Sequence, residues 1–454
     1  MSSHLPKELL SSLEGLPGYD AAAFEAVHTA GPAPTSIRIN PAKPPAVLPE
    51  NAVPVPWSSS GYYLASRPSF TLDPLFHAGT YYVQEASSMF LEQALRQTTD
   101  LTRSLRVLDC CAAPGGKSTL LRSLLSPESL LVSNEVIRNR VSVLQENMIK
   151  WGAPGTVVTN NDPRDFQRLE NYFDVIVVDA PCSGSGLFRR EPDAVNEWSP
   201  GNVQLCWQRQ QRILADCWPA LRREGILIYS TCAYSREEDE DILDWLMMEF
   251  DATSCSLQLD PEWNIVETRS KKGGYGYRFY PHRLKGEGLF IAALRKNDGN
   301  SFAPPRKLNQ PEKPSKKELE TIHQWIQPAS SLALFIHQEQ VHALPESRLV
   351  DIPILQSACY LKEAGITLGQ LSAKDFIPHH HLAMSTMAHP GIPALSLSRE
   401  QALQYLRKED LHPGTTHRGW VLVRYADHNL GWIKVLPQRS NNYYPKEWRI
   451  LKRE

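Results

Sequence analysis

The stretch Leu105-Arg106-Val107-Leu108-Asp109-Cys110-Cys111-Ala112-Ala113-Pro114-Gly115-Gly116-Lys117-Ser118 decides the fold. A short apolar run is followed at once by small residues, and a helix is predicted over residues 118–125. A strand, a tight loop and a helix in this order are typical of the first unit of a parallel, doubly wound sheet. Small residues let the backbone approach a ligand closely, and a helix N-terminus favours an anionic group. The sequence therefore predicts an α/β protein with a ligand at this loop.

Two familiar nucleotide-binding motifs are excluded at this loop. Gly116-Lys117-Ser118 looks like the end of a phosphate-binding P-loop, but that motif needs a glycine five residues before Gly116, and Cys111 stands there. The glycine fingerprint of dinucleotide-binding folds is absent as well. The ligand of this loop must therefore be recognised in another way.

The chain continues the same alternation of strands and helices after this loop. Further apolar runs predict buried strands, and the intervening segments predict helices. Acidic residues suited to a helix N-terminus open the last of these helices. The predicted strands cover residues 129–132, 155–158, 175–178, 226–229 and 289–294, and the predicted helices cover residues 138–151, 203–221 and 237–250. This pattern predicts a Rossmann-like, doubly wound sheet.

Acidic side chains follow the second and third predicted strands. In an open α/β sheet, ligands bind at the carboxyl ends of the strands. Glu135 is suited there to accept hydrogen bonds from ribose hydroxyls, and Asp162 to reach an adenine amino group. Taken alone, each acidic residue is more often a loop or capping residue. Together with the small-residue loop, they favour an adenosine-type ligand.

Two cysteines, Cys182 and Cys232, follow two other predicted strands, so we expect both thiols to face one pocket. A helix predicted from Ser235 onward would favour the thiolate of Cys232. A thiolate can add to carbon 6 of a pyrimidine, which makes carbon 5 nucleophilic toward a methyl sulfonium; a base must then remove the carbon-5 proton. Asp179 is placed to hydrogen-bond the polarised edge of the ring.

Composition favours a soluble protein with reduced thiols. The chain has 454 residues, of which 42% are apolar, and no apolar run reaches the roughly 18 residues of a membrane span. The first residues show no signal pattern. The eight cysteines include no Cys-x-x-Cys pair, and Cys206 and Cys217 are expected to be buried in a helix. We expect a cytoplasmic protein without a metal site.

Net charge does not mark the chain as a nucleic-acid binder. The formal charge is −2, so an RNA-binding surface would have to gather its basic groups locally. For each basic residue, an isolated solvated charge is an equally common explanation. The candidates for such a surface are Arg138, Arg140, Arg189, Arg190, Arg278, Arg283, Lys285, Arg295 and Lys296.

Three motifs, in this order, resemble the Nop/Sun family of RNA cytosine-5 methyltransferases. They are Asp-x-Cys-Ala-Ala-Pro-Gly-Gly-Lys ending at Lys117, Asp-Ala-Pro-Cys-Ser-Gly beginning at Asp179, and Ser-Thr-Cys ending at Cys232. The resemblance covers residues 73–296, including Gln84-Glu85-Ala86-Ser87-Ser88-Met89 and Gly286-Glu287-Gly288. Chance agreement of three long motifs in order is negligible.

The resemblance implies S-adenosyl-L-methionine as the methyl donor. Glu135 would hold its ribose, Asp162 its adenine, and Arg140 matches a basic position of the family five residues after Glu135. Asp179 would lie between the methionine end and the target base. Cys232 would be the nucleophile, and Cys182 would assist breakdown of the covalent adduct. The cofactor loop would comprise Cys111, Ala112, Ala113, Pro114, Gly115, Gly116 and Lys117.

The C-terminal segment resembles the PUA-like tail of RsmF, the YebU-like subfamily of bacterial 16S rRNA methyltransferases. The residues that carry this resemblance are 419–423, 430–434 and 441–446. The subfamily often has Lys-Asn-x-Tyr-Pro near the end, whereas Ser440-Asn441-Asn442 replaces the basic start here. A PUA-like module would bind structured RNA through contacts with the RNA backbone and through the shape of the RNA. The alternative is that the module is a structural cap with no role in RNA binding.

Shifts of composition predict five segments along the chain. They are an N-terminal RNA-binding-like α+β region (1–73), a methyltransferase domain (74–296), a linker rich in Asn, Pro, Lys and Gln (297–317), a small α+β domain (318–390) and a PUA-like RNA-binding domain (391–454). In the last segment, a helix is predicted over 399–407 and strands over 419–425 and 430–435.

These observations lead to one function with several alternatives. We expect a monomer that methylates carbon 5 of a cytosine in rRNA, with 16S rRNA or the small ribosomal subunit as its partner, and that binds neither DNA nor a membrane. A tRNA-directed enzyme would have the same pocket. A non-catalytic ribosome assembly factor would need a damaged pocket, and none is visible. A redox sensor that pairs Cys110 with Cys111 is disfavoured, since adjacent cysteines rarely pair without strain.

Overall fold

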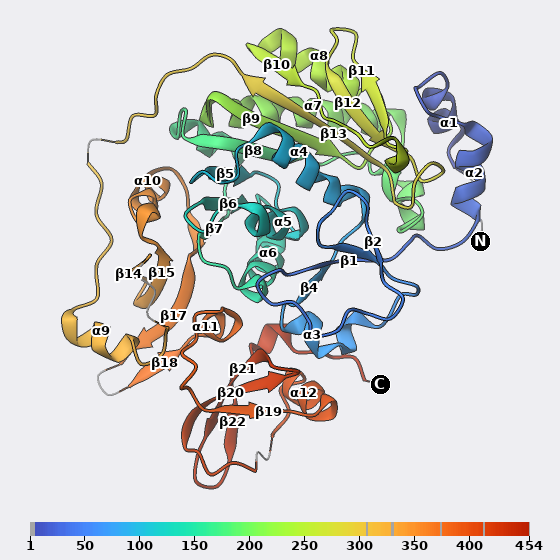
Figure 1. Cartoon of the computed structure of the whole chain (residues 1–454). Helices are drawn as coiled ribbons and strands as arrows, with labels where there is room; N and C mark the ends of the chain where they lie inside the picture. The colour runs from blue at the N-terminus through green and yellow to red at the C-terminus, as the bar shows by residue number, and fades with distance from the viewer. Residues whose placement is uncertain (1–4, 306, 328–330, 373–374, 412–413, 454) are drawn as a thin grey trace.

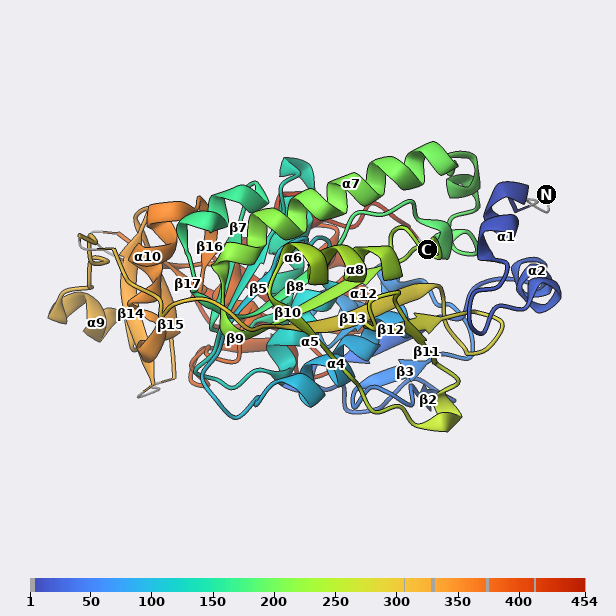
Figure 2. The same ribbon diagram turned by 90° about the horizontal axis from the view of Figure 1, so that it is seen from above.

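The computed structural model describes residues 5–305, 307–327, 331–372, 375–411 and 414–453. Four sheets are present in these ranges, one large and central and three smaller (Figure 1). Figure 2 shows that the molecule is elongated, with the N-terminal helices at one end and α9 at the other. No helix of the described residues is long and apolar enough to cross a membrane.

The large sheet contains ten strands within the described ranges, in the order β11-β12-β13-β9-β8-β5-β6-β7-β16, with β10 paired to β13. The five strands β5 to β9 are parallel to their neighbours in this group. The strand bounds are β5 Arg106–Asp109, β6 Leu130–Asn134, β7 Thr156–Thr159, β8 Phe173–Asp179, β9 Leu221–Thr231, β10 Ala252–Cys255, β11 Val266–Arg269, β12 Tyr275–Phe279, β13 Leu289–Lys296 and β16 Leu361–Ala364. The predicted Rossmann-like sheet is confirmed, because each of its six predicted strands is present.

Helices cover both faces of this sheet, and α7 runs along one of them (Figure 2). Successive residues of a strand point to opposite faces, so Leu108 packs into the core beneath α7 and α8 while Val107 packs into the core beneath α4 and α5. The helix bounds are α4 Leu91–Thr98, α5 Gly116–Leu124, α6 Arg138–Trp151, α7 Pro200–Cys217 and α8 Glu240–Glu249.

Two helix boundaries differ from the sequence prediction. The helix predicted to reach residue 221 ends at Cys217, because Pro219 follows and Leu221 already begins β9. The helix predicted from residue 237 begins only at Glu240. Of the acidic residues before it, Glu238 and Asp239 are buried and hydrogen-bonded to Ser183 and Thr231, and this segment forms a hydrogen-bonded turn from Arg236 instead of a helix.

The N-terminal segment forms a separate small sheet that packs against the start of α5. Its order is β2-β3-β1-β4. From β1, the buried guanidinium of Arg38 donates to Gln84 Oε1 at 2.8 Å and to Thr119 Oγ1 at 2.6 Å. The bounds are α1 Lys7–Leu13, α2 Ala21–Thr29, β1 Ser36–Ile39, β2 Val53–Pro54, β3 Gly61–Tyr63, α3 Pro74–His77 and β4 Tyr81–Val83.

The C-terminal part contains two further sheets, β14-β15-β17-β18 and β19-β20-β21-β22. The strand β16 leaves this part and pairs with β7 at the edge of the large sheet. The predicted helix and strands of the last segment correspond to α12, β20 and β21. The bounds are α9 Lys316–Ile322, β14 Leu332–His337, β15 Gln340–Pro345, α10 Asp351–Ala358, β17 Ile366–Leu371, β18 Phe376–Pro378, α11 His380–Met384, β19 Ala394–Ser396, α12 Arg399–Leu406, β20 Gly419–Tyr425, β21 His428–Val435 and β22 Ser440–Asn442.

One lysine lies where the three parts meet. Lys43 Nζ donates to the carbonyl oxygens of Ala78 at 2.9 Å and Met384 at 3.0 Å, and also to the carbonyl of Lys150. Ala78 precedes β4, Lys150 lies in the last turn of α6, and Met384 ends α11. The N-terminal sheet, the large sheet and the C-terminal part are therefore joined by one ammonium group.

Candidate active site

A cleft of about 490 Å³ lies at the carboxyl ends of β5, β8 and β9. One wall is the loop that follows β5, and the opposite wall carries a thiol. The N-terminal segment contributes a third wall through Tyr82 to Glu85. The lining residues among those predicted for the site are Cys111, Ala112, Ala113, Pro114, Gly116, Lys117, Arg140, Asp179 and Cys232.

The loop after β5 is built from backbone rather than from side chains. Ala112 N donates to Asn134 O at 2.8 Å, which ties the loop to the end of β6. Gly115, at the N-cap of α5, has φ +114°, a conformation that favours glycine. A Cβ at Gly116 would come within 3.3 Å of Tyr82 Cε1. The loop therefore keeps a narrow space open between α5 and the N-terminal segment.

Glu135 and Arg140 form a pair at the end of β6. Glu135 is 3% exposed, and its Oε2 lies 3.4 Å from Arg140 Nη1, while its Oε1 accepts from Ile137 N at 2.9 Å. Arg140 also donates to Ala113 O at 2.7 Å and lines the cleft. This arginine connects the acidic residue to the loop.

Asp162 lies after β7, as predicted, but the cleft described above does not include it. Its carboxylate accepts from Arg164 N at 3.2 Å and caps the short helix that begins at Pro163. The contact of Asp162 with an adenine therefore stays a prediction.

Lys117 and Asp179 join the two sides of the cleft. Lys117 Nζ lies 2.7 Å from Asp179 Oδ2, and Ser230 Oγ donates to Asp179 Oδ1 at 2.8 Å. Burial lowers the pKa of Lys117, but the Asp179 carboxylate, together with further negative groups such as Asp109, more than offsets this, so the net shift of the Lys117 pKa is upward. The lysine is thus held as a cation, and it orients the carboxylate that faces the cleft.

The two cysteine thiols meet, as the sequence predicted. Cys182 Sγ and Cys232 Sγ are 2.9 Å apart, but only Cys232 is among the residues that line the cleft, so the expectation that both thiols face one pocket is met for Cys232 alone. Contact with Cys232, together with burial, raises the pKa of Cys182 well above its ordinary value. Two thiols in contact do not both ionise readily.

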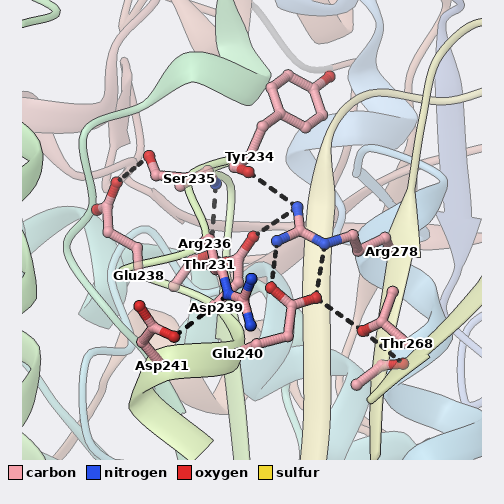
Figure 3. A network of polar contacts seen from close by, with 12 residues as sticks. Thr231, Tyr234, Ser235, Arg236, Glu238, Asp239, Glu240, Asp241, Thr268 and Arg278 are labelled. Carbon is pink, nitrogen blue, oxygen red and sulfur yellow. Dashed lines mark hydrogen bonds and ion pairs between the residues drawn. The ribbon is translucent and has the colours of Figure 1, made fainter. Parts of the chain in front are cut away.

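The surroundings of Cys232 correct one expectation. No helix begins at Ser235, because the chain forms a loop and a turn before α8 starts at Glu240. A helix N-terminus therefore does not act on the Cys232 thiol. The buried carboxylates of Glu238, Asp239 and Glu240 and the buried Arg278 form a polar network next to the loop instead (Figure 3).

Three members of the predicted basic surface are buried. Arg278 is 1% exposed and pairs with Asp239 at 3.0 Å, and Lys296 donates to the carbonyls of Trp218 and Leu221. The side chain of Arg189 is also buried, 3.3 Å from Glu287. Their assignment to an RNA-facing surface is wrong, since each arginine compensates an internal carboxylate and the lysine binds backbone carbonyls. Arg138, Arg140, Arg190, Arg283 and Lys285 are exposed.

Sequence reasoning missed several residues of the cleft. Tyr82, Gln84, Glu85 and Glu287 line it, and burial raises the pKa of Glu287 to about 7. Three of these residues, Gln84, Glu85 and Glu287, belong to two of the motifs that carry the family resemblance. The sequence therefore marked them as family motif residues, but it did not indicate that they line the cleft. Cys206 and Cys217 are buried in α7 as predicted, and all eight cysteines are free thiols. Among the described residues, no cluster of His, Cys, Asp or Glu is arranged to hold a metal ion.

Comparison with known proteins agrees with this architecture. Residues 97–295 match the model of 16S rRNA methyltransferase RsmB/F, residues 5–86 that of the N-terminal domain of 16S rRNA methyltransferase RsmF, and residues 393–450 that of the methyltransferase RsmF PUA domain. Ribosomal RNA small subunit methyltransferase F of Aliivibrio fischeri strain ES114 is 30% identical over 413 residues, which cover 87% of this chain and 85% of that protein. The chain belongs to the RsmF family of methyltransferases.

Other relatives and solved structures extend the comparison. Ribosomal RNA small subunit methyltransferase F of Salmonella agona is 31% identical over 408 residues, covering 87% of this chain and 84% of that protein. A methyltransferase homolog protein from Pyrococcus horikoshii has a TM-score of 0.51 at 26% identity, covering 64% of this chain and all of the other. NSun6 from the same organism has a TM-score of 0.54 at 19% identity, covering 66% and 100%, and supports the fold.

Proposed function

We propose that this RsmF-family protein transfers a methyl group from S-adenosyl-L-methionine to carbon 5 of a cytosine in 16S rRNA, through a covalent adduct with Cys232. The observation that carries the proposal is the meeting of two thiols at 2.9 Å beside the Lys117–Asp179 pair. A covalent nucleophile and an oriented carboxylate in one cleft, with a second thiol in contact with the nucleophile, are the groups that cytosine-5 methylation needs.

The residues beside the cleft fit S-adenosyl-L-methionine. Glu135 places a buried carboxylate at the end of β6, where ribose hydroxyls are bound in folds of this type. The small-residue loop leaves a space that a Cβ at Gly116 would narrow. S-adenosyl-L-methionine, when bound, supplies an electrophilic methyl group. Residues Cys111 to Lys117, Glu135, Arg140 and Asp162 are the proposed cofactor contacts.

Cys232 would begin the reaction as the nucleophile. Its sulfur forms a bond to carbon 6 of the cytosine, and the electron pair of the 5,6 double bond moves to carbon 5. Asp179, oriented by Lys117 and Ser230, accepts a hydrogen bond from the exocyclic amino group. Carbon 5 thereby becomes able to accept the methyl group.

Cys182 would complete the reaction. While Cys232 carries negative charge, the proton of the pair stays on Cys182. Once Cys232 is bonded to carbon 6, that charge is gone and Cys182 can ionise more easily. Carbon 5 takes the methyl group as the sulfonium–methyl bond breaks. The Cys182 thiolate, whose own proton has passed to solvent, then accepts the carbon-5 proton, the electron pair of that C–H bond re-forms the 5,6 double bond, and the carbon–sulfur bond breaks to return the Cys232 thiolate. The two thiols thus have different roles.

The choice of 16S rRNA rests on the relatives and on the C-terminal module. The named relatives are small-subunit rRNA methyltransferases, and residues 393–450 match an RsmF PUA domain. We propose a cytoplasmic monomer that binds the small subunit or its rRNA. A tRNA-directed enzyme of the same chemistry and a non-catalytic assembly factor are the two competing assignments.

Two cysteine variants test this proposal. Cys232→Ala should abolish methyl transfer to 16S rRNA while cofactor binding persists, and Cys182→Ala should accumulate a protein–RNA adduct that survives denaturing electrophoresis. Cys206→Ala, which removes a buried thiol of α7, is the matched control. Methylation by Cys232→Ala at the wild-type rate would overturn the mechanism.

Mapping of 5-methylcytosine in rRNA and tRNA from cells with and without the protein distinguishes the substrates. Loss of a mark in 16S rRNA supports the proposal. Loss of a tRNA mark alone favours the tRNA-directed enzyme, and loss of no mark favours the assembly factor.

A further inference from the structure

A buried carboxylate, Glu238, connects the loops that carry the two thiols. Its side chain accepts from Ser183 N at 2.9 Å and from Ser183 Oγ at 2.5 Å, next to Cys182. It also accepts from Ser235 Oγ at 2.9 Å, three residues after Cys232 (Figure 3). Glu238 is 0% exposed. Every proposed role of the thiol pair depends on these loops keeping their positions.

The segment before Cys182 is held through the same carboxylate. Gln210 Nε2, from α7, donates to Glu238 Oε1 at 3.0 Å and to Pro181 O at 3.1 Å. Gln210 is also fully buried. Glu238 therefore fixes the chain on both sides of Cys182, directly through Ser183 and indirectly through Gln210.

The loop of Cys232 has further anchors that do not involve Glu238. Gly186 N donates to Cys232 O at 2.7 Å, and Arg278 Nη1 donates to Tyr234 O at 2.9 Å. Arg278 in turn pairs with Asp239 and Glu240 (Figure 3). Gly184, at φ +76°, lies between Ser183 and the residues that contact the Cys232 loop. The segment before Gly184, which contains Cys182 and Ser183, is thus the segment whose position depends most on Glu238.

The charge of Glu238 opposes ionisation of Cys182, so the support that Glu238 gives to release comes from its contacts and not from its charge. The pKa of Cys182 is raised mainly by its contact with Cys232, then by burial, and the Glu238 carboxylate adds to the increase. A negative group close to Cys182 disfavours a second negative charge there.

We propose that Glu238 is a positioning residue that holds Cys182 against Cys232, and that its loss impairs release of the covalent adduct more than its formation. This inference rests on the proposed function, in which Cys232 attacks and Cys182 assists release. It adds a residue outside the cleft to the machinery, because Glu238 touches neither the cofactor loop nor the lining of the cleft.

The test compares adduct with product in full-length Glu238→Gln, using 16S rRNA and S-adenosyl-L-methionine. Glutamine keeps the shape but removes the charge and replaces one acceptor oxygen by an NH2 donor, which weakens the charge-assisted bonds from Ser183. The ratio of denaturation-resistant adduct to methylated RNA should rise by about tenfold, as expected for a lost charge-assisted hydrogen bond. Glu238→Asp should restore part of the wild-type ratio. The exposed neighbour Glu237 supplies the matched control, Glu237→Gln.

Two serine variants keep the proposal testable if Glu238→Gln fails to fold. Ser183→Ala should raise the adduct-to-product ratio, whereas Ser235→Ala should leave that ratio near wild type, because only Ser183 adjoins Cys182. Equal ratios in both serine variants, or a proportional fall of adduct and product in Glu238→Gln, would overturn the positioning role. Absence of any adduct in Cys182→Ala would instead overturn the proposed function.

Discussion

The cofactor loop and the thiol loops face each other across one cleft, yet they are built differently. The loop over residues 111–117 is shaped by backbone: small residues, a left-handed glycine and hydrogen bonds to its carbonyls. The thiol loops are held by buried charged side chains, chiefly Glu238, Asp239, Glu240 and Arg278. A backbone-built site is specified by a short contiguous motif, whereas a charge-built site needs partners from several strands and helices.

Removing the arginine of the thiol side should have the largest effect on folding. Arg278→Met leaves Asp239 and Glu240 buried without their cation, and breaking a buried pair costs about 3–5 kcal/mol of unfolding free energy. Denaturant unfolding measures this loss. Arg269→Met, on the neighbouring strand and exposed, is the control. A loss below about 1 kcal/mol would mean that the charge network does not stabilise the thiol side.

Removing the cation that joins the two sides should have the next largest effect. Lys117→Met leaves the Asp179 carboxylate without its ion pair and disturbs its orientation, so single-turnover methyl transfer should fall about a hundredfold. Lys272→Met, in an exposed turn, controls for loss of charge. Methyl transfer at the wild-type rate by Lys117→Met would show that the reaction does not need the ion pair between the cofactor loop and Asp179.

A variant confined to the cofactor side should affect binding alone. Glu135→Gln keeps the shape of a buried residue but weakens its contact with Arg140 and its acceptance of ribose hydroxyls. The dissociation constant of S-adenosyl-L-methionine, measured by calorimetry, should rise about tenfold. The adduct-to-product ratio should not change. A change in that ratio would show that the two sides are coupled through more than Lys117.

The last effect concerns pH. Burial raises the pKa of Asp109 to about 7, despite the hydrogen bond from Ser118. The folded protein therefore holds a proton that the unfolded chain releases near pH 4, and its stability declines as pH rises from about 4 to about 7. Asp109→Asn should remove this pH dependence. The unfolding free energy of the variant relative to the wild type should therefore increase between pH 5.5 and pH 8, and thermal unfolding of both proteins at each pH measures this difference. Parallel pH profiles of the two proteins would contradict this assignment.

The contrast between the two sides also explains what the sequence could predict. The strand, loop and helix from Leu105 to Leu124 follow from local patterns, and the meeting of Cys182 with Cys232 follows from their positions after parallel strands. Both inferences use residues close together in the chain or a rule about strand ends.

The remaining features depend on residues far apart in the chain. The acidic run at Glu238 reads as the start of a helix until its distant partners Ser183 and Gln210 are known. Arg278 reads as a surface charge for the same reason. The pairing of β16 with β7 joins segments about 200 residues apart, and no local sequence pattern predicts this pairing.

The Lys43 junction has a thermodynamic consequence. Its ammonium binds carbonyls that precede β4, end α6 and end α11, and β4 carries Tyr82 into the cleft. A ligand that displaces α11 must either break a buried hydrogen bond or move the wall of the cleft. For a ligand that displaced α11, binding at the C-terminal part and binding in the cleft would be linked equilibria, and each would change the affinity of the other by the same factor.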